Sequence, residues 1–173
     1  MQVTPPSSWI ARHASLVPNR GPVLDLAAGS GRHTRYFKGL GRAVTAVDRD
    51  VSGLADLGGD AQISVIAADL EGGAPWPLGT RRFAGIVVTN YLHRPLFPRI
   101  AAALQMGGVL LYETFGAGNE KFGKPSNPDF LLQPGELLGF AEAEGLVVRV
   151  YHCGEVAEPR PAVVQRIAAV RYK

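Results

Sequence analysis

Cysteine is almost absent from this sequence: Cys153 is the single one among 173 residues. One cysteine can form neither an intramolecular disulfide bond nor a thiolate cluster around a metal ion, and this scarcity is typical of a reducing compartment. No apolar run approaches the roughly 20 residues needed to span a bilayer, and the first residues lack the basic start and apolar stretch of a signal peptide. These absences predict a cytoplasmic protein with no membrane partner and no metal site.

Dense runs of lysine or arginine are also missing. The chain carries 18 Lys and Arg against 15 Asp and Glu, a formal net charge of +3, and its arginines are scattered along the whole length. A nucleic-acid site usually concentrates basic residues in one patch or stripe. The charge therefore permits an RNA partner but does not indicate one, and nothing in the sequence predicts an oligomeric state.

The composition that remains is globular, with 46% hydrophobic and 19% charged residues. A chain of this length can bury one hydrophobic core and is too short for two domains that each have a core of ordinary size. We therefore expect one domain over residues 1–173, which begins with a helical segment over residues 1–20.

Short apolar runs alternate with segments of helical periodicity. Continuous apolar runs are typical of parallel strands that are covered on both faces. The expected strands are Val23–Leu26, Ala43–Asp48, Ile63–Ala67, Phe83–Thr89, Val109–Glu113, Leu146–Tyr151 and Val163–Val170. Helices are expected near residues 5–17, 32–40, 51–57, 96–104 and 134–141. The predicted fold is an α/β, doubly wound, mostly parallel seven-stranded sheet with helices on both faces and a C-terminal antiparallel hairpin.

A glycine-rich turn, Asp25–Gly31, follows the first strand. Such turns let the backbone approach a ligand, and the next helix can offer its first amides to an anionic group. A dinucleotide site usually has Gly-x-Gly-x-x-Gly, but Thr34 holds the place of the third glycine. Asp25 would repel a pyrophosphate, whereas a ligand with an ammonium and a sulfonium gains from a carboxylate. The turn favours S-adenosylmethionine over NAD(P).

Two further acids follow the next strands. Asp48 ends the second strand, where a carboxylate can accept hydrogen bonds from ribose hydroxyls, and Asp69 follows the third, where an adenine amino group could donate to it. Asp48 could instead cap the helix at Val51, and Asp69 could simply form a turn with Leu70. Together with Asp25, acids at three successive strand ends indicate a nucleoside ligand.

These motifs, in order, resemble those of class I S-adenosylmethionine-dependent methyltransferases and, more loosely, the small tellurite-resistance-type enzymes. The matching segments are Val23–Gly31, Ala43–Asp48, Ala67–Leu70, the strand that ends at Thr89–Asn90, and the terminal hairpin. The resemblance implies S-adenosylmethionine as the cofactor, bound by Asp25, Ala27, Gly29 and Gly31 at the methionine part, Asp48 at the ribose, Asp69 at the adenine, and by Leu70 and Asn90. Ala27 stands where the family usually has its first glycine.

Candidate catalytic residues follow the fourth and fifth strands. His93 could act as a base or could only cap or pack. Glu113 would be costly in a cleft without a partner, and its alternative role is an ion pair with a neighbouring arginine. Methyl transfer depends mainly on positioning and desolvation, so a base is optional. Arg32 and His33 could bind an anionic acceptor; the alternative, above all for Arg32, is a solvated surface position.

The segment Gly116–Gln133 is a long connection that leaves the ligand-binding edge of the sheet. Connections of this length are usually functional or disordered. We expect a mobile lid whose Phe122 and Phe130 exclude water; the alternative is a rigid loop packed by the same two side chains. The sequence as a whole predicts a methyltransferase for a small-molecule or otherwise exposed acceptor. An NAD(P)-dependent oxidoreductase and a non-catalytic S-adenosylmethionine-binding regulatory module are the alternatives.

Overall fold

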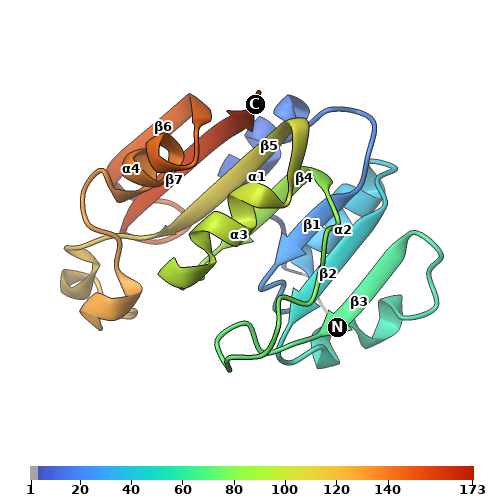
Figure 1. Ribbon diagram of the computed structural model, residues 1–173. Helices are drawn as coiled ribbons and strands as arrows, with labels where there is room; N and C mark the ends of the chain where they lie inside the picture. The colour runs from blue at the N-terminus through green and yellow to red at the C-terminus, as the bar shows by residue number, and fades with distance from the viewer. Residues whose placement is uncertain (1–3) are drawn as a thin grey trace.

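The computed structural model describes residues 4–173, which form a seven-stranded sheet with helices on both faces (Figure 1). The strands run in the order β3-β2-β1-β4-β5-β7-β6. They are β1 Val23–Leu26, β2 Val44–Asp48, β3 Ile63–Ala67, β4 Phe83–Thr89, β5 Leu104–Phe115, β6 Leu146–Val156 and β7 Ala162–Arg171. Strands β1 to β5 pair in parallel, and β7 lies antiparallel between β5 and β6. The predicted fold class is confirmed, while residues 1–3 of the expected N-terminal helical segment lie outside the described residues.

Each face of the sheet is covered by two short helices. They are α1 Ser8–His13, α2 Arg32–Gly39, α3 Phe97–Ala102 and α4 Glu136–Ala143. Ile100 of α3 and Phe140 of α4 pack on one face, whereas Ile10 of α1 and Phe37 of α2 pack on the other. Helices this short are marginal alone, so their stability comes from these buried side chains.

Short 3₁₀-helices fill several connections. They are η1 Ala14–Leu16, η2 Ser52–Leu57, η3 Arg94–Leu96, η4 Asn119–Lys121 and η5 Pro128–Phe130. The predicted helix near residues 51–57 is thus the 3₁₀ element η2. No helix of residues 4–173 combines the length and the apolar character that a membrane span needs.

Two predicted boundaries were wrong around β5. The helix expected to reach Leu104 ends at Ala102, and β5 begins at Leu104. Gly107 and Gly108 lie inside β5, where its pairing with β4 shifts register. A Cβ on Gly108 would approach the carbonyl oxygen of Phe83 to 2.8 Å, so glycine is what lets the two strands come together there.

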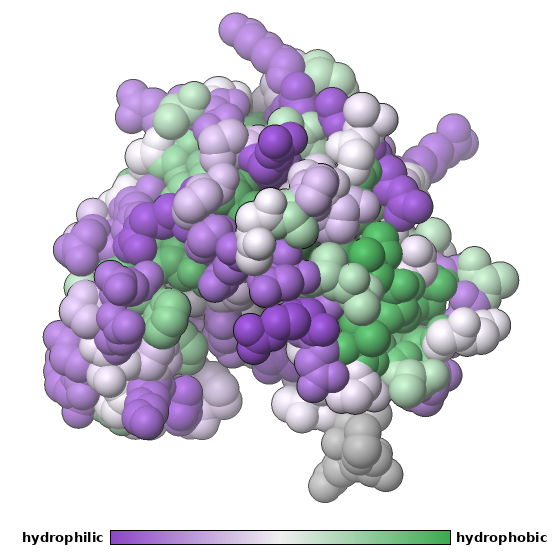
Figure 2. All heavy atoms as spheres, turned by 60° about the horizontal axis from the view of Figure 1, so that its bottom comes forward, coloured by the Kyte–Doolittle hydropathy of each residue, from purple (hydrophilic) through white to green (hydrophobic). Residues whose placement is uncertain are grey.

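The strand order reverses between β1 and β4, which both pair in parallel with their neighbours. In open α/β sheets ligands bind beyond the carboxyl ends of the strands at such a switch point. Those ends lie along the lower edge of Figure 1. Figure 2 turns this edge forward and shows it indented beside a lobe, on the side where Figure 1 has residues 116–133.

Candidate functional site

The turn after β1 is built by backbone hydrogen bonds. Ala28 N–H donates to the carbonyl of Val47 at 3.0 Å, and Gly31 N–H donates to that of Ala28 at 2.8 Å. Gly31 has φ +76° and a Cβ there would collide with the Leu54 side chain. Gly29 has φ +55° and nothing within 4 Å of its Cβ position, so its open side is available to a ligand. Glycine is therefore required at Gly31 for packing and at Gly29 for conformation.

Ala27 and Asn90 are the non-glycine residues of positive φ in the described part of the chain, with φ +57° and +53°. They follow β1 and β4, the two strands at the switch point. Both line one cavity of about 420 Å³, hereafter the turn cavity, together with Gly29, Asp48 and Arg32. Left-handed backbone at residues with a Cβ costs about 1–2 kcal/mol and concentrates at functional sites.

Asp25 lies beneath the turn and does not line the turn cavity. Its side chain is 3% exposed and accepts a hydrogen bond from Thr34 Oγ1 at 2.7 Å. Burial raises the pKa of Asp25 to about 7, although the bonds from Thr34 act in the opposite direction. Thr34 stands where a dinucleotide turn has its third glycine, and here its hydroxyl is the hydrogen-bond partner of the buried Asp25. Asp25 can act on a ligand through its charge rather than by contact.

Asp48 joins the turn to the end of β2. Its Oδ2 accepts a hydrogen bond from Gly29 N–H at 2.7 Å, and its Oδ1 accepts one from Asp50 N–H at 3.0 Å. Each carboxylate oxygen keeps a further lone pair. The alternative role, capping the next helix, belongs to Asp50, which accepts Ser52 N–H at 3.0 Å. Asp48 is left to face the cavity.

A second cavity of about 400 Å³, hereafter the outer cavity, lies beyond Asp48. It shares Ala27, Asp48 and Tyr91 with the turn cavity and adds Asp69, Leu70 and Phe130 among others. Asp69 Oδ1 accepts Glu71 N–H at 2.9 Å, so Asp69 forms the turn considered in the sequence and also lines the cavity. The two roles are compatible.

Tyr91 was not singled out in the sequence, although it stands in the polar run that ends β4. It borders both cavities, and its hydroxyl is buried without a hydrogen-bond partner among residues 4–173. Burial, and after it the nearby Glu71 carboxylate, raises the pKa of Tyr91 above its usual value. The hydroxyl therefore stays protonated at neutral pH and can donate a hydrogen bond.

Glu113 lies on β5 and is 7% exposed. It accepts a hydrogen bond from Ser7 Oγ at 2.7 Å and forms an ion pair with Arg166 Nε at 2.5 Å. The arginine pairing considered in the sequence is thus present, and each carboxylate oxygen has a partner. His93 directly precedes η3 and lines neither the turn cavity nor the outer cavity. A catalytic role for either residue stays a prediction.

His33 is buried at the start of α2 and lines the turn cavity. Its Nε2 accepts a hydrogen bond from Ser7 N–H at 3.1 Å. Burial, and after it the neighbouring Arg32 charge, lowers the pKa of His33 to about 3. Burial therefore favours the neutral ring, and binding of an anionic acceptor by His33 stays a prediction.

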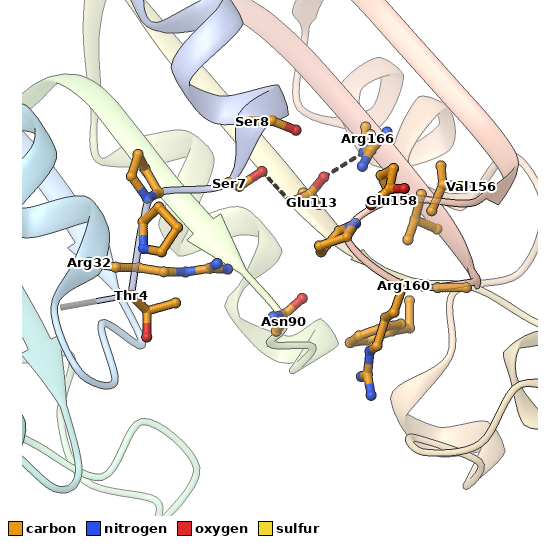
Figure 3. Close-up of a pocket in the computed structure, with 16 residues that line it drawn as sticks. Thr4, Ser7, Ser8, Arg32, Asn90, Glu113, Val156, Glu158, Arg160 and Arg166 are labelled. Carbon is orange, nitrogen blue, oxygen red and sulfur yellow. Dashed lines mark hydrogen bonds and ion pairs between the residues drawn. The ribbon is translucent and has the colours of Figure 1, made fainter. Parts of the chain in front are cut away.

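Arg32 and His33 both border the turn cavity, but Arg32 also reaches a further opening. Its side chain borders both the turn cavity and a third cavity of about 530 Å³. This hairpin cavity lies between the N-terminal segment, the start of α2, the end of β5 and the β6–β7 hairpin. Figure 3 shows Arg32 and Asn90 at its mouth and the chain Ser7–Glu113–Arg166 along its back. Thr4, Arg32 and Asn90 are common to the turn and hairpin cavities.

The turn cavity thus shares lining residues with the outer cavity and with the hairpin cavity, and the three lie next to one another along the carboxyl edge of the sheet. Within residues 4–173, no group of three His, Cys, Asp or Glu side chains is placed to hold a metal ion.

Comparison with known proteins identifies the fold. No family model and no curated protein sequence matches the chain. Solved structures do match, among them 1,6-didemethyltoxoflavin-N1-methyltransferase of Burkholderia thailandensis, determined with 1,6-didemethyltoxoflavin and S-adenosylhomocysteine. It is 23% identical, with a TM-score of 0.67, over 93% of this chain and 75% of that chain. The chain has the class I S-adenosylmethionine-dependent methyltransferase fold.

Two further structures agree. TehB of Haemophilus influenzae, of the tellurite-resistance type, has a TM-score of 0.72 at 20% identity over 94% of this chain and 61% of that chain. An S-adenosylmethionine-dependent methyltransferase of Mesorhizobium loti has a TM-score of 0.70 at 18% identity over 93% of this chain and 96% of that chain. The resemblance noted in the sequence is confirmed for the fold, and the looser likeness to the tellurite-resistance type is confirmed in the same sense.

Proposed function

We propose that this protein is an S-adenosylmethionine-dependent methyltransferase that acts on a small-molecule or otherwise exposed acceptor. One observation carries the proposal. The glycine turn and the Asp48 carboxylate line one cavity at the switch point, together with Ala27 and Asn90, whose φ angles are positive. The neighbouring structures solved with S-adenosylmethionine or its product support the same cofactor.

The residues present fit this cofactor. The open side of Gly29 admits a ligand, and Asp48 has lone pairs left for ribose hydroxyls. Asp69 and Leu70 border the outer cavity, where we place the adenine, and Phe130 offers it an apolar surface. Thr34 and the buried Asp25 disfavour a dinucleotide pyrophosphate.

Bound S-adenosylmethionine would supply a methyl group on a sulfonium, whose carbon–sulfur bond breaks with its electron pair kept by sulfur. This chain's contribution is positional. Asn90 stands between the turn and hairpin cavities, so an acceptor in the hairpin cavity approaches the cofactor past this residue. The neutral Tyr91 hydroxyl borders the turn and outer cavities and can donate a hydrogen bond to a ligand in them. Any proton released by the acceptor passes to solvent.

Two measurements on the full chain test the proposal. Calorimetry should show binding of S-adenosylmethionine and S-adenosylhomocysteine and no comparable binding of NAD⁺. Incubation with labelled donor and fractionated metabolite pools should then transfer label to a small molecule. Tight NAD⁺ binding without heat from the methionine nucleosides would overturn the proposal in favour of an oxidoreductase. Donor binding without transfer to metabolite, tellurite or tRNA pools would favour the regulatory module.

A further inference from the structure

The hairpin cavity holds more positive than negative charge. Arg32 enters it from α2, and Arg160 lies on the opposite side in the β6–β7 loop, with Asn90 between them (Figure 3). No hydrogen bond or ion pair joins the Arg32 guanidinium to a residue of the described range 4–173. Arg166 is in the same cavity, but its charge is matched by Glu113.

Arg160 is likewise without an acid partner in that range. Its guanidinium lies 5.7 Å from the centre of the Phe115 ring and donates to the Lys124 carbonyl at 3.4 Å. The remaining acid of the cavity is Glu158, which is exposed. Two arginines against one exposed acid leave an excess positive charge once the Glu113–Arg166 pair is set aside.

The rest of the wall is largely apolar. It is supplied mainly by Pro5, Pro6, Phe115, Val156, Pro159 and Val164. A cavity of about 530 Å³ is large enough for a compact organic molecule. Apolar walls favour an apolar body, while guanidinium groups recognise carboxylates and phosphates through paired hydrogen bonds.

We propose that the hairpin cavity binds the methyl acceptor, and that this acceptor is a compact molecule with an apolar body and an anionic group paired with Arg32 and Arg160. The inference rests on the proposed function, because it assigns the cavity to the acceptor. The anionic group is a carboxylate or a phosphate, since both match the guanidinium geometry.

Arg32 borders both the turn cavity and the hairpin cavity, whereas Arg160 borders only the hairpin cavity of the three. The carboxylate of a bound cofactor could therefore pair with Arg32, but it would not pair with Arg160. The two variants Arg32→Gln and Arg160→Gln consequently distinguish an acceptor site from an extension of the cofactor site.

The test is a titration of the full chain, followed by NMR, with and without S-adenosylhomocysteine. The probes are benzoate, phenyl phosphate and the neutral benzamide, which share one apolar body. We expect at least one acid to bind about tenfold more tightly than benzamide, and each arginine variant to weaken that acid about tenfold. Arg82→Gln is the matched control, because Arg82 is exposed and bonds only to carbonyls of its own turn.

Each outcome decides the inference. Equal affinity for the acids and benzamide, or acid binding that survives both variants, overturns it. Loss of S-adenosylmethionine affinity in Arg32→Gln, with acid affinity unchanged in Arg160→Gln, also overturns it, because the arginines would then not act together on an acceptor. Preference for benzoate or for phenyl phosphate identifies the acid. If the acids bind as expected while S-adenosylmethionine does not, the anion site stands and the proposed methyltransferase activity fails.

Discussion

The turn cavity and the hairpin cavity meet at Asn90 but are built in different ways. The turn cavity takes its shape from backbone hydrogen bonds and strained φ angles at the ends of neighbouring strands. The hairpin cavity is lined by side chains from the N-terminal segment, α2, β5 and the β6–β7 loop, which are far apart in the sequence. A backbone-built site tolerates little change, whereas a side-chain-built site can change its ligand without disturbing the sheet.

Ser7 connects the two regions. Its backbone N–H donates to His33 at the start of α2, and its hydroxyl donates to Glu113 at the end of β5. The wall of the hairpin cavity is therefore fastened to the same helix that follows the glycine turn. If the two cavities are built in these different ways, substitutions at Glu113 should lower the stability of the fold, and substitutions at Asp48 should weaken cofactor binding.

The largest effect is expected from Glu113→Ala. This change removes the acid from an ion pair whose side chains are 10% and 15% exposed, and it leaves Arg166 with an uncompensated charge. The free energy of unfolding should fall by about 3 kcal/mol, measured by chemical denaturation. Cofactor affinity per folded molecule should stay unchanged. Glu113→Gln, which keeps an acceptor for Ser7, should lose less; equal losses would mean that charge is not the cause.

Asp48→Ala should weaken S-adenosylmethionine binding by about 1.5–3 kcal/mol, because hydrogen bonds to a charged group are lost. The fold should survive, since the residue is half-buried at a strand end. Calorimetry gives the affinity and thermal melting gives the stability. Asp50→Ala is the control, because that acid holds η2 and does not line the turn cavity. Similar affinity losses in both variants would contradict a specific role for Asp48.

Asp25→Asn should remove a pH dependence of cofactor affinity. The pKa of Asp25 is raised to about 7, so the group is mostly neutral at pH 6 and mostly charged at pH 8. A cationic ligand binds the charged form better, so affinity should rise across this range by up to about tenfold. The pH dependence that comes from titration of the ligand itself remains in the variant. The difference between the two pH profiles therefore gives the contribution of Asp25. Identical pH profiles would show that Asp25 does not influence the ligand.

We expect a lid, but over a shorter range than Gly116–Gln133. Both ends are fixed: Asn119 accepts Val163 N–H at 3.0 Å, and Leu131 and Leu132 are buried. Between them Phe122 and Phe130 are 41% and 51% exposed. Amide hydrogen exchange at residues 120–130 should slow about fivefold or more when donor and acceptor bind. Strong protection before ligand addition would instead identify a rigid loop.

The smallest effect is expected from Ala27→Gly. Glycine relieves the left-handed strain of about 1–2 kcal/mol, but it also adds freedom to the unfolded chain. The net gain in the free energy of unfolding should be at most about 1 kcal/mol, with cofactor affinity unchanged. Ala28→Gly, at a buried position without positive φ, should be destabilising. A loss of stability in Ala27→Gly would mean that the methyl group packs usefully.

Much of the turn cavity could be predicted from the sequence, because its parts are local. Apolar runs placed β1, β2, β3 and β4 at or within one residue of their observed bounds. Asp48 ends β2, and Gly29 and Asp69 follow β1 and β3. All three border cavities at the edge where parallel strands bring their carboxyl ends together. The strain at Ala27 was not predicted, since a backbone angle is set by the closing of the turn.

The hairpin cavity could not be predicted, because tertiary structure alone brings its parts together. Residue type determined that Glu113 needed a partner, but only the pairing of β5 with β7 placed Arg166 beside it. The sequence offered His33 as a possible ligand for an anion, but only the fold buries its ring and thereby lowers its pKa. Local pattern determines strands and turns because their geometry depends on near neighbours. Charge state, ion pairs and cavity walls depend on which distant segments exclude water from one another, and the folded chain decides that.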